Sequence, residues 1–203
     1  THFVFGVLEF VPEHLSIYQL TIEPNTWFYR YPPKLPDDDL ASEMQFEIES
    51  IVDECGYDQY EVSAFSKPDR QCSHNINYWK FGDYVGIGAG AHSKLSGAEG
   101  VTRMVKYKQP KRYMDGVLSG DAILSSQTIG AESLPFEFFM NALRLNSGVS
   151  ADLFEKRTGL PVNVVDSHLK ALEKRGLVTF SNSIIKPTTT GMRFLNEVLQ
   201  EFL

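Results

Sequence analysis

The sequence predicts an α/β domain followed by a mainly helical domain. Residues 15–22 and 59–64 alternate as β-strands do, and between them apolar residues recur at helical spacing. A strand, a helix and a second strand in this order are typical of a parallel sheet. Residues 119–133, SGDAILSSQTIGAES, are small and polar and predict a linker. We therefore place the domains at residues 1–120 and 121–203.

The first two predicted strands are connected by a loop and a helix. The loop EPNTWFYRYPPKLP is rich in proline and aromatic residues. Asp37–Asp39 then precede residues 40–55, whose apolar positions fit one helix face. The acids suit a helix N-terminus, where they meet the positive end of the dipole, and metal binding is the alternative for this triplet. Gly56 is expected to end the helix.

The rest of the first domain is predicted to hold a third short strand at residues 84–88 and a helix at 109–118. In the second domain, helical spacing recurs at residues 136–145, 151–156 and 162–172. LVTF and SIIKP then predict a hairpin, and residues 194–202 a last helix. Helices followed by a two-stranded wing are a winged-helix arrangement. Its third helix mixes cations with acids, which favours packing or partner contact over DNA binding.

Composition limits the classes of function. The chain has 203 residues, 42% of them apolar, and a net charge of -7, as expected of a soluble globular protein that does not bind nucleic acid. No apolar run reaches the roughly 20 residues that a transmembrane helix needs. Cys55 and Cys72 cannot form a disulfide framework, so we expect a cytoplasmic setting. The chain begins with Thr rather than Met, which fits a fragment.

Residues 72–93, CSHNINYWKFGDYVGIGAGAHS, have the composition of a binding surface. A neutral imidazole such as that of His74 is a common axial ligand of heme iron, and Tyr78 offers a flat ring beside it. The alternatives are a structural histidine and an aromatic residue of the core. The glycine run lets backbone approach a ligand, but its spacing does not fit a dinucleotide fingerprint.

Four segments together resemble the HemW family of radical S-adenosylmethionine proteins, which is related to oxygen-independent coproporphyrinogen dehydrogenase. They are HLSIYQLTIEPNTWF, YEVSAF, the segment of residues 72–93 and PFEFFMNALRL. The resemblance implies the C-terminal part of a partial, open α/β barrel, followed by the winged-helix-like domain. It also implies a [4Fe-4S] cluster, S-adenosylmethionine and heme, with delivery of the heme to membrane-associated respiratory proteins.

The chain departs from this family at the cluster. The family's ligands form a CxxxCxxC loop, and no such motif occurs in these 203 residues. Because three thiolates in one loop are needed, Cys55 and Cys72 cannot hold the cluster. The chain therefore looks like the C-terminal half of a longer protein, and we expect no cluster in it.

The resemblance assigns site residues without naming a catalytic one. It implies heme contacts at His74, Asn75, Tyr78 and Trp79, with His74 on the iron. It implies a S-adenosylmethionine cavity lined by Leu20, Thr21, Gly88, Ala89, Ala91 and His92. The function implied is heme chaperoning. A coproporphyrinogen dehydrogenase-like oxidoreductase and a non-catalytic winged-helix interaction module remain as alternatives.

Overall fold

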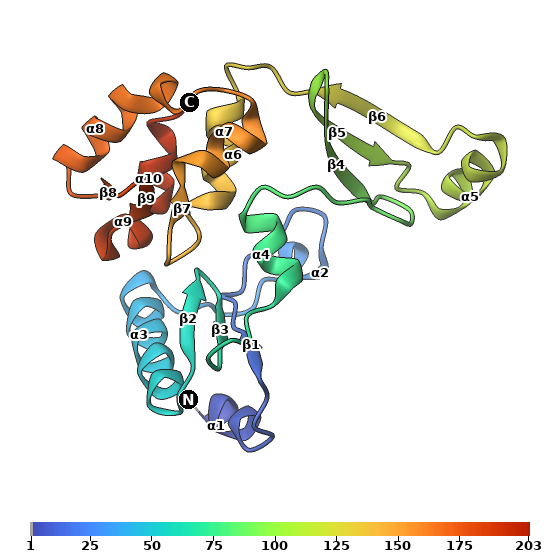
Figure 1. Ribbon diagram of the computed structural model, residues 1–203. Helices are drawn as coiled ribbons and strands as arrows, with labels where there is room; N and C mark the ends of the chain where they lie inside the picture. Colours follow the sequence, from blue (N-terminus) through green and yellow to red (C-terminus); the bar gives the residue numbers. More distant parts are fainter. Residues whose placement is uncertain (1) are drawn as a thin grey trace. The chain divides into compact units, whose positions relative to one another are not determined.

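The computed structural model describes the backbone of residues 2–203 and the side chains of residues 4–203, in a mixed α/β fold with small sheets (Figure 1). The chain forms two compact units, residues 1–72 and residues 73–203. Every strand pairing in the described part is antiparallel, so the parallel sheet predicted from the strand, helix, strand order is wrong. The predicted domain boundary near residue 120 stays a prediction.

The first unit contains a three-stranded sheet of order β1-β3-β2. Its elements are α1 (His2–Leu8), β1 (His14–Ser16), α2 (Trp27–Arg30), α3 (Asp38–Glu54), β2 (Asp58–Glu61) and β3 (Ala64–Ser66).

Two strand predictions in this unit need correction. The strand predicted at residues 15–22 ends at Ser16, and beyond it Tyr18 and Leu20 are exposed, so no packing supports a longer strand. The strand predicted at 59–64 is a hairpin instead. The backbone N–H of Ser63 donates to the Glu61 carboxylate at 3.1 Å, which stabilises the turn between β2 and β3.

Helix α3 begins and ends as predicted. The Asp37 carboxylate accepts a hydrogen bond from the Leu40 N–H at 2.9 Å, so the acids cap the helix. Cys55 is the C-cap, and Gly56 follows with a φ of 80°, a conformation that glycine adopts without strain. The buried Val52 packs with Tyr57 and Phe65 in the core of this unit.

The second unit begins with α4 (Ser73–Trp79), a helix that the sequence patterns did not predict. A three-stranded sheet follows, with β4 (His92–Gly97), β5 (Gly100–Lys106) and β6 (Ile123–Thr128) in the order β4-β5-β6. Helix α5 (Pro110–Ser119), which was predicted, connects β5 to β6 (Figure 1).

This sheet corrects two further predictions. Residues 84–88 form no strand and make only an isolated bridge between Tyr84 and Lys94. Residues 119–133 are not a plain linker, because they contain β6, whose exposed, polar sequence carries little strand signal. Tyr84 pairs with Lys94 across the glycine run, and β6 pairs with β5 across helix α5. Local periodicity does not reveal pairing of this kind.

The helices and the hairpin predicted after residue 133 are confirmed, with two differences. Strand β7 adds a third strand to the hairpin, in the order β7-β9-β8, and helix α9, which was not predicted, precedes the last predicted helix, α10. The elements are α6 (Leu134–Ala142), β7 (Val149–Ser150), α7 (Ala151–Thr158), a 3-10 turn (Val162–Val165), α8 (Asp166–Lys174), β8 (Val178–Ser181), β9 (Ile184–Pro187), α9 (Thr189–Arg193) and α10 (Leu195–Gln200).

Phenylalanine rings form the core of this region. The Phe138 ring contacts Phe139 and Phe154 edge to face at centroid distances of 5.3 and 5.2 Å, and Phe202 stacks on Phe139 at 4.3 Å. Phe81, in the turn after α4, joins the same cluster at 5.7 Å from Phe138. The α4 end is therefore anchored to this core.

Gly191→Ala should destabilise the protein. A Cβ at Gly191 would lie 1.8 Å from the Leu177 carbonyl oxygen, so backbone must move. We expect a loss of about 1–3 kcal/mol in the free energy of unfolding, the usual range for overpacking. Urea denaturation measures it. Gly97→Ala is the matched control, because a Cβ there meets nothing within 4 Å, and equal stabilities of the two variants would contradict the prediction.

Candidate functional site

Helix α4 displays the predicted heme contacts on two faces. His74 and Tyr78 are four residues apart, as are Asn75 and Trp79, so each pair shares one face of the helix. The His74 side chain is exposed, and its ring lies 4.8 Å from that of Tyr78. The Tyr78 ring lies in turn 4.5 Å from that of Tyr84, at 34°. One imidazole and two phenol rings thus form a continuous series, which we call the ring series.

Trp79 occupies a different setting from His74. The Arg144 guanidinium lies 4.4 Å from the centre of the Trp79 ring, in a cation–π contact between α4 and the segment after α6. Its indole Nε1 is buried and donates to no described group. The Trp79 ring therefore packs between α4 and the segment after α6, and its predicted heme contact stays a prediction.

The turn after α4 aims Tyr84 at Tyr78. Phe81 adopts a φ of 52° while almost fully buried. Gly82 follows, where a Cβ would lie 2.0 Å from the Asn77 Oδ1 atom, so the close approach requires glycine. The Asn77 side-chain amide donates to the Asp83 carbonyl at 2.9 Å, which stabilises the turn.

An ion pair between the buried Lys94 and the exposed Asp83 holds this turn against the sheet. Lys94 on β4 is 2% exposed, and its ammonium donates to the Phe81 carbonyl and to the Asp83 carboxylate, both at 3.1 Å. The same ammonium lies 4.0 Å from the Phe81 ring centre. The Asp83 carboxylate also accepts from the Ser96 N–H at 3.0 Å and the Ser96 hydroxyl at 2.8 Å.

Both groups of the ion pair have shifted pKa values, for different reasons. Burial lowers the pKa of Lys94, and Asp83 opposes that change. Burial alone would raise the pKa of Asp83, but hydrogen bonds from Ser96 and Lys94 outweigh it, so the pKa lies below its usual value.

Most backbone N–H groups of the glycine run, residues 86–91, already donate hydrogen bonds within the protein. A Cβ on Gly86 would lie 2.1 Å from the His92 carbonyl, so this backbone is closely packed. Val85 and Ile87 are 68% and 85% exposed, which leaves apolar side chains as the main groups for a ligand. The N–H groups of Gly86, Gly88, Gly90 and Ala91 donate to Ser93 Oγ, Tyr113 Oη, Tyr107 O and Gly88 O respectively.

The remaining predicted residues are divided between the units. His92 begins β4, and Ala89 lies in the exposed part of the glycine run. Leu20 and Thr21 belong to the first unit, where both are exposed and outside any strand. Among the described residues, no group of three His, Cys, Asp or Glu side chains is placed to hold a metal ion.

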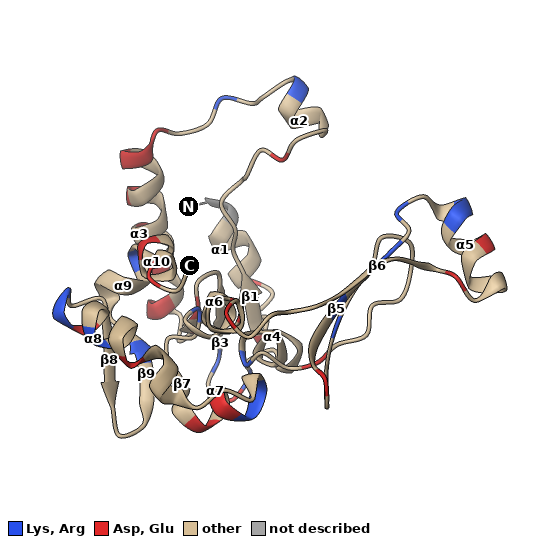
Figure 2. Ribbon diagram, turned by 90° about the horizontal axis from the view of Figure 1, so that it is seen from above, with Lys and Arg blue, Asp and Glu red and all other residues tan. Residues whose placement is uncertain are grey.

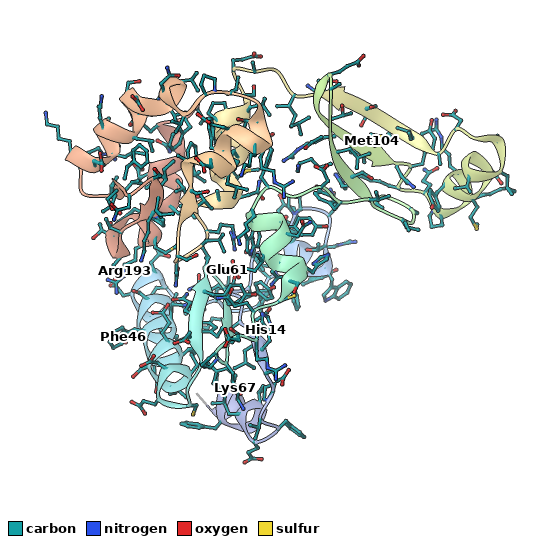
Figure 3. All side chains as sticks on the ribbon, viewed as in Figure 1. His14, Phe46, Glu61, Lys67, Met104 and Arg193 are labelled. Atoms are coloured by element: carbon teal, nitrogen blue, oxygen red, sulfur yellow. The ribbon has the colours of Figure 1, made fainter. Side chains whose placement is uncertain are left out.

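A second polar cluster lies in the first unit. His14 and Glu61 are on its sheet (Figure 3), and the His14 Nε2 atom lies 2.8 Å from the Tyr60 hydroxyl. Burial lowers the pKa of His14, and the nearby Glu61 opposes that change. The sequence patterns did not single out this cluster, because His14 and Tyr60 are 46 residues apart.

The sequence patterns also did not single out Arg103, whose charge acts on Tyr84 of the ring series. Lys and Arg residues are present on β5 (Figure 2), and Arg103 of that strand pairs with Glu137 of α6. Burial raises the pKa of Tyr84, and the Arg103 charge opposes that rise. The signal that could have located Arg103 is the alternating segment GVTRMVK, which forms β5.

The sequence is similar to those of several known proteins. Residues 130–194 match the HemN C-terminal domain. The chain is 42% identical to the heme chaperone HemW of Haemophilus influenzae over 97% of this chain and 50% of that protein. It is also 42% identical to HemW of Escherichia coli, over 97% of this chain and 51% of that protein, and 33% identical to HemW of Bacillus subtilis, over 100% and 54%.

The solved structure of coproporphyrinogen III oxidase (HemN) from Escherichia coli, described as a radical SAM enzyme, has a similar fold. It superposes with a TM-score of 0.73 over 98% of this chain and 50% of that one, at 18% identity. This likeness concerns the fold alone. The chain spans about half the length of the curated relatives it matches. In the part of the chain that the structure describes, no helix is long and apolar enough to span a membrane.

Lys94→Met should weaken both the fold and the ring series. The change removes a charged donor to Asp83 and to the Phe81 carbonyl, so we expect a loss of about 2–3 kcal/mol in the free energy of unfolding. Urea denaturation measures the loss, and near-ultraviolet circular dichroism should show a weaker tyrosine signal. Lys80→Met, an exposed change close to α4, is the control. If both variants match the unchanged protein, the ion pair does not hold the turn.

Asp83→Asn should reduce the sensitivity of the fold to acid. Since the folded pKa of Asp83 lies below its unfolded value, the charged carboxylate stabilises the fold above about pH 4, and this is lost as the pH falls further. The variant should be less stable at neutral pH, and its stability should fall less steeply below pH 4. Denaturation midpoints across a pH series test this, with Asp115→Asn as control. An unchanged acid slope would contradict the assignment.

Proposed function

The chain is a relative of the HemW heme chaperones along 97% of its length, and we propose that it supplies the heme-holding part of such a protein. The observation that carries the proposal is the ring series on α4. An exposed imidazole lies 4.8 Å from a phenol ring, which itself lies 4.5 Å from a second ring. A metal ligand next to aromatic surface is the arrangement that a porphyrin with a central iron requires.

In this proposal each α4 residue has a separate role. His74 supplies the imidazole to the heme iron, and Tyr78 lies against the edge of the macrocycle. Asn75, on the next face, is proposed as a further contact to the porphyrin. Trp79, whose ring also contacts Arg144, is proposed as a further porphyrin contact.

A [4Fe-4S] cluster and S-adenosylmethionine are proposed for the longer protein only. The residues present do not fit the cluster, because the chain has just two cysteines, one after α3 and one before α4. The cofactor contacts are proposed at Gly88, Ala89, Ala91 and His92 of the second unit. The contacts predicted at Leu20 and Thr21 of the first unit stay a prediction. Since most amides of the glycine run are already bonded, we propose apolar and carbonyl contacts there.

The finer features of the fold and the biology belong to the same proposal. We propose that the first unit belongs to a partial radical S-adenosylmethionine barrel and that residues 121–203 form a winged-helix-like domain. The match to the HemN C-terminal domain at residues 130–194 supports a distinct module there. Delivery of heme to membrane-associated respiratory proteins, from a cytoplasmic location, completes the proposed function.

His74→Ala should remove the iron ligand. We expect heme affinity to fall about tenfold or more and the Soret band to shift, because one strong bond is lost while the aromatic surface stays. Absorbance titration of the protein with heme measures both effects. His168→Gln, which changes a histidine on α8, is the control. Turnover of coproporphyrinogen without heme binding, measured on the full-length protein, would instead favour the oxidoreductase function.

A further inference from the structure

Tyr84 of the ring series, Lys94 and Arg103 form a row of paired residues across neighbouring segments. Tyr84 bridges to Lys94, and Lys94 pairs directly with Arg103 across β4 and β5. Residues directly opposite each other in a sheet share a face, so Tyr84, Lys94 and Arg103 point to the same side. Neighbouring strands are about 4.8 Å apart, which brings the Arg103 side chain within reach of groups bound near Tyr84.

The two cations of this row, Lys94 and Arg103, differ in exposure and in hydrogen-bond partners. Lys94 is 2% exposed and is enclosed by Phe81 and Asp83. The Arg103 side chain is 37% exposed. Its Nη2 atom donates to the Glu137 carboxylate, while its Nε atom is buried and donates to no described group. A guanidinium carries five N–H donors in a rigid fork, so Arg103 has capacity for a second acceptor.

The surroundings favour an anionic acceptor. Arg157 adds positive charge to this part of the second unit, because its charge acts on Lys94. Asp83 pairs with Lys94, and Glu137 pairs with Arg103. The positive character is local, because the chain as a whole has a net charge of -7.

We propose that Arg103 binds a carboxylate of the ligand that the ring series holds. The inference rests on the proposed heme function and identifies the group as a propionate side chain of the porphyrin. The carboxylate accepts hydrogen bonds from the guanidinium, beside or in place of Glu137, as in other Arg–carboxylate pairs. Arg103 is then a specificity-determining residue that favours porphyrins carrying free carboxylates.

The test compares heme with its dimethyl ester, which keeps the iron and the macrocycle but lacks the carboxylates. Both are titrated by absorbance into the unchanged protein, Arg103→Gln, Glu137→Gln and the control Lys106→Gln. Lys106 is on the same strand but faces the Tyr113 ring of α5. If Arg103→Gln fails to fold by circular dichroism, the double variant Arg103→Gln with Glu137→Gln takes its place, since it leaves neither charge unpaired.

Arg103→Gln should bind heme about tenfold more weakly and bind the ester as the unchanged protein does. Glu137→Gln should bind heme at least as tightly as the unchanged protein, and Lys106→Gln should have no effect. Equal losses for heme and ester in Arg103→Gln, or a matching loss in Glu137→Gln, would overturn the inference in favour of a structural ion pair. If the unchanged protein binds neither compound, the proposed function itself fails.

Discussion

The buried ammonium of Lys94 is the group on which the candidate site depends. It holds the Phe81 carbonyl and the Asp83 carboxylate, and through them the turn that follows α4. That turn contains an unusual backbone conformation at Phe81 and a glycine that no other residue can replace without movement of Asn77. An ammonium buried in this way is costly unless every proton finds an acceptor or a ring, and here the Phe81 ring provides the third contact. The geometry of the ring series therefore follows from charge satisfaction in the sheet.

The second constraint is the phenylalanine core. Phe81 contacts Phe138 of α6, and Phe138 contacts Phe139 and Phe154, so the turn after α4 is fastened to the same cluster that organises the C-terminal helices. Arg103 and Glu137 make a second link, from β5 to α6. Within the second unit, the sheet, α4 and the C-terminal helices thus share one set of packing and ionic contacts.

The local patterns predicted helices better than strands. Helix α3, its acidic N-cap and its end at Gly56 followed from spacing and from capping chemistry, which involve neighbours in the sequence. The hairpin of β8 and β9 followed for the same reason. Strands β4 and β5 were missed although they form a local hairpin that turns between Gly97 and Gly100. Strand β6 was missed because it pairs with β5 across helix α5 and has no buried face. The α4 residues were not predicted as a helix, and their assignment as a site stays a prediction.

The sequence by itself determined which residues make this chain a relative of the HemW chaperones and placed His74, Asn75, Tyr78 and Trp79 in one motif. These are properties of residue type and spacing. Only the tertiary structure decided that His74 is exposed beside two tyrosine rings, that Trp79 packs against Arg144, and that Tyr84, Lys94 and Arg103 form one row. The reason is physical: burial, strand register and ion pairing are set by contacts between distant segments, and each changes what a side chain can do.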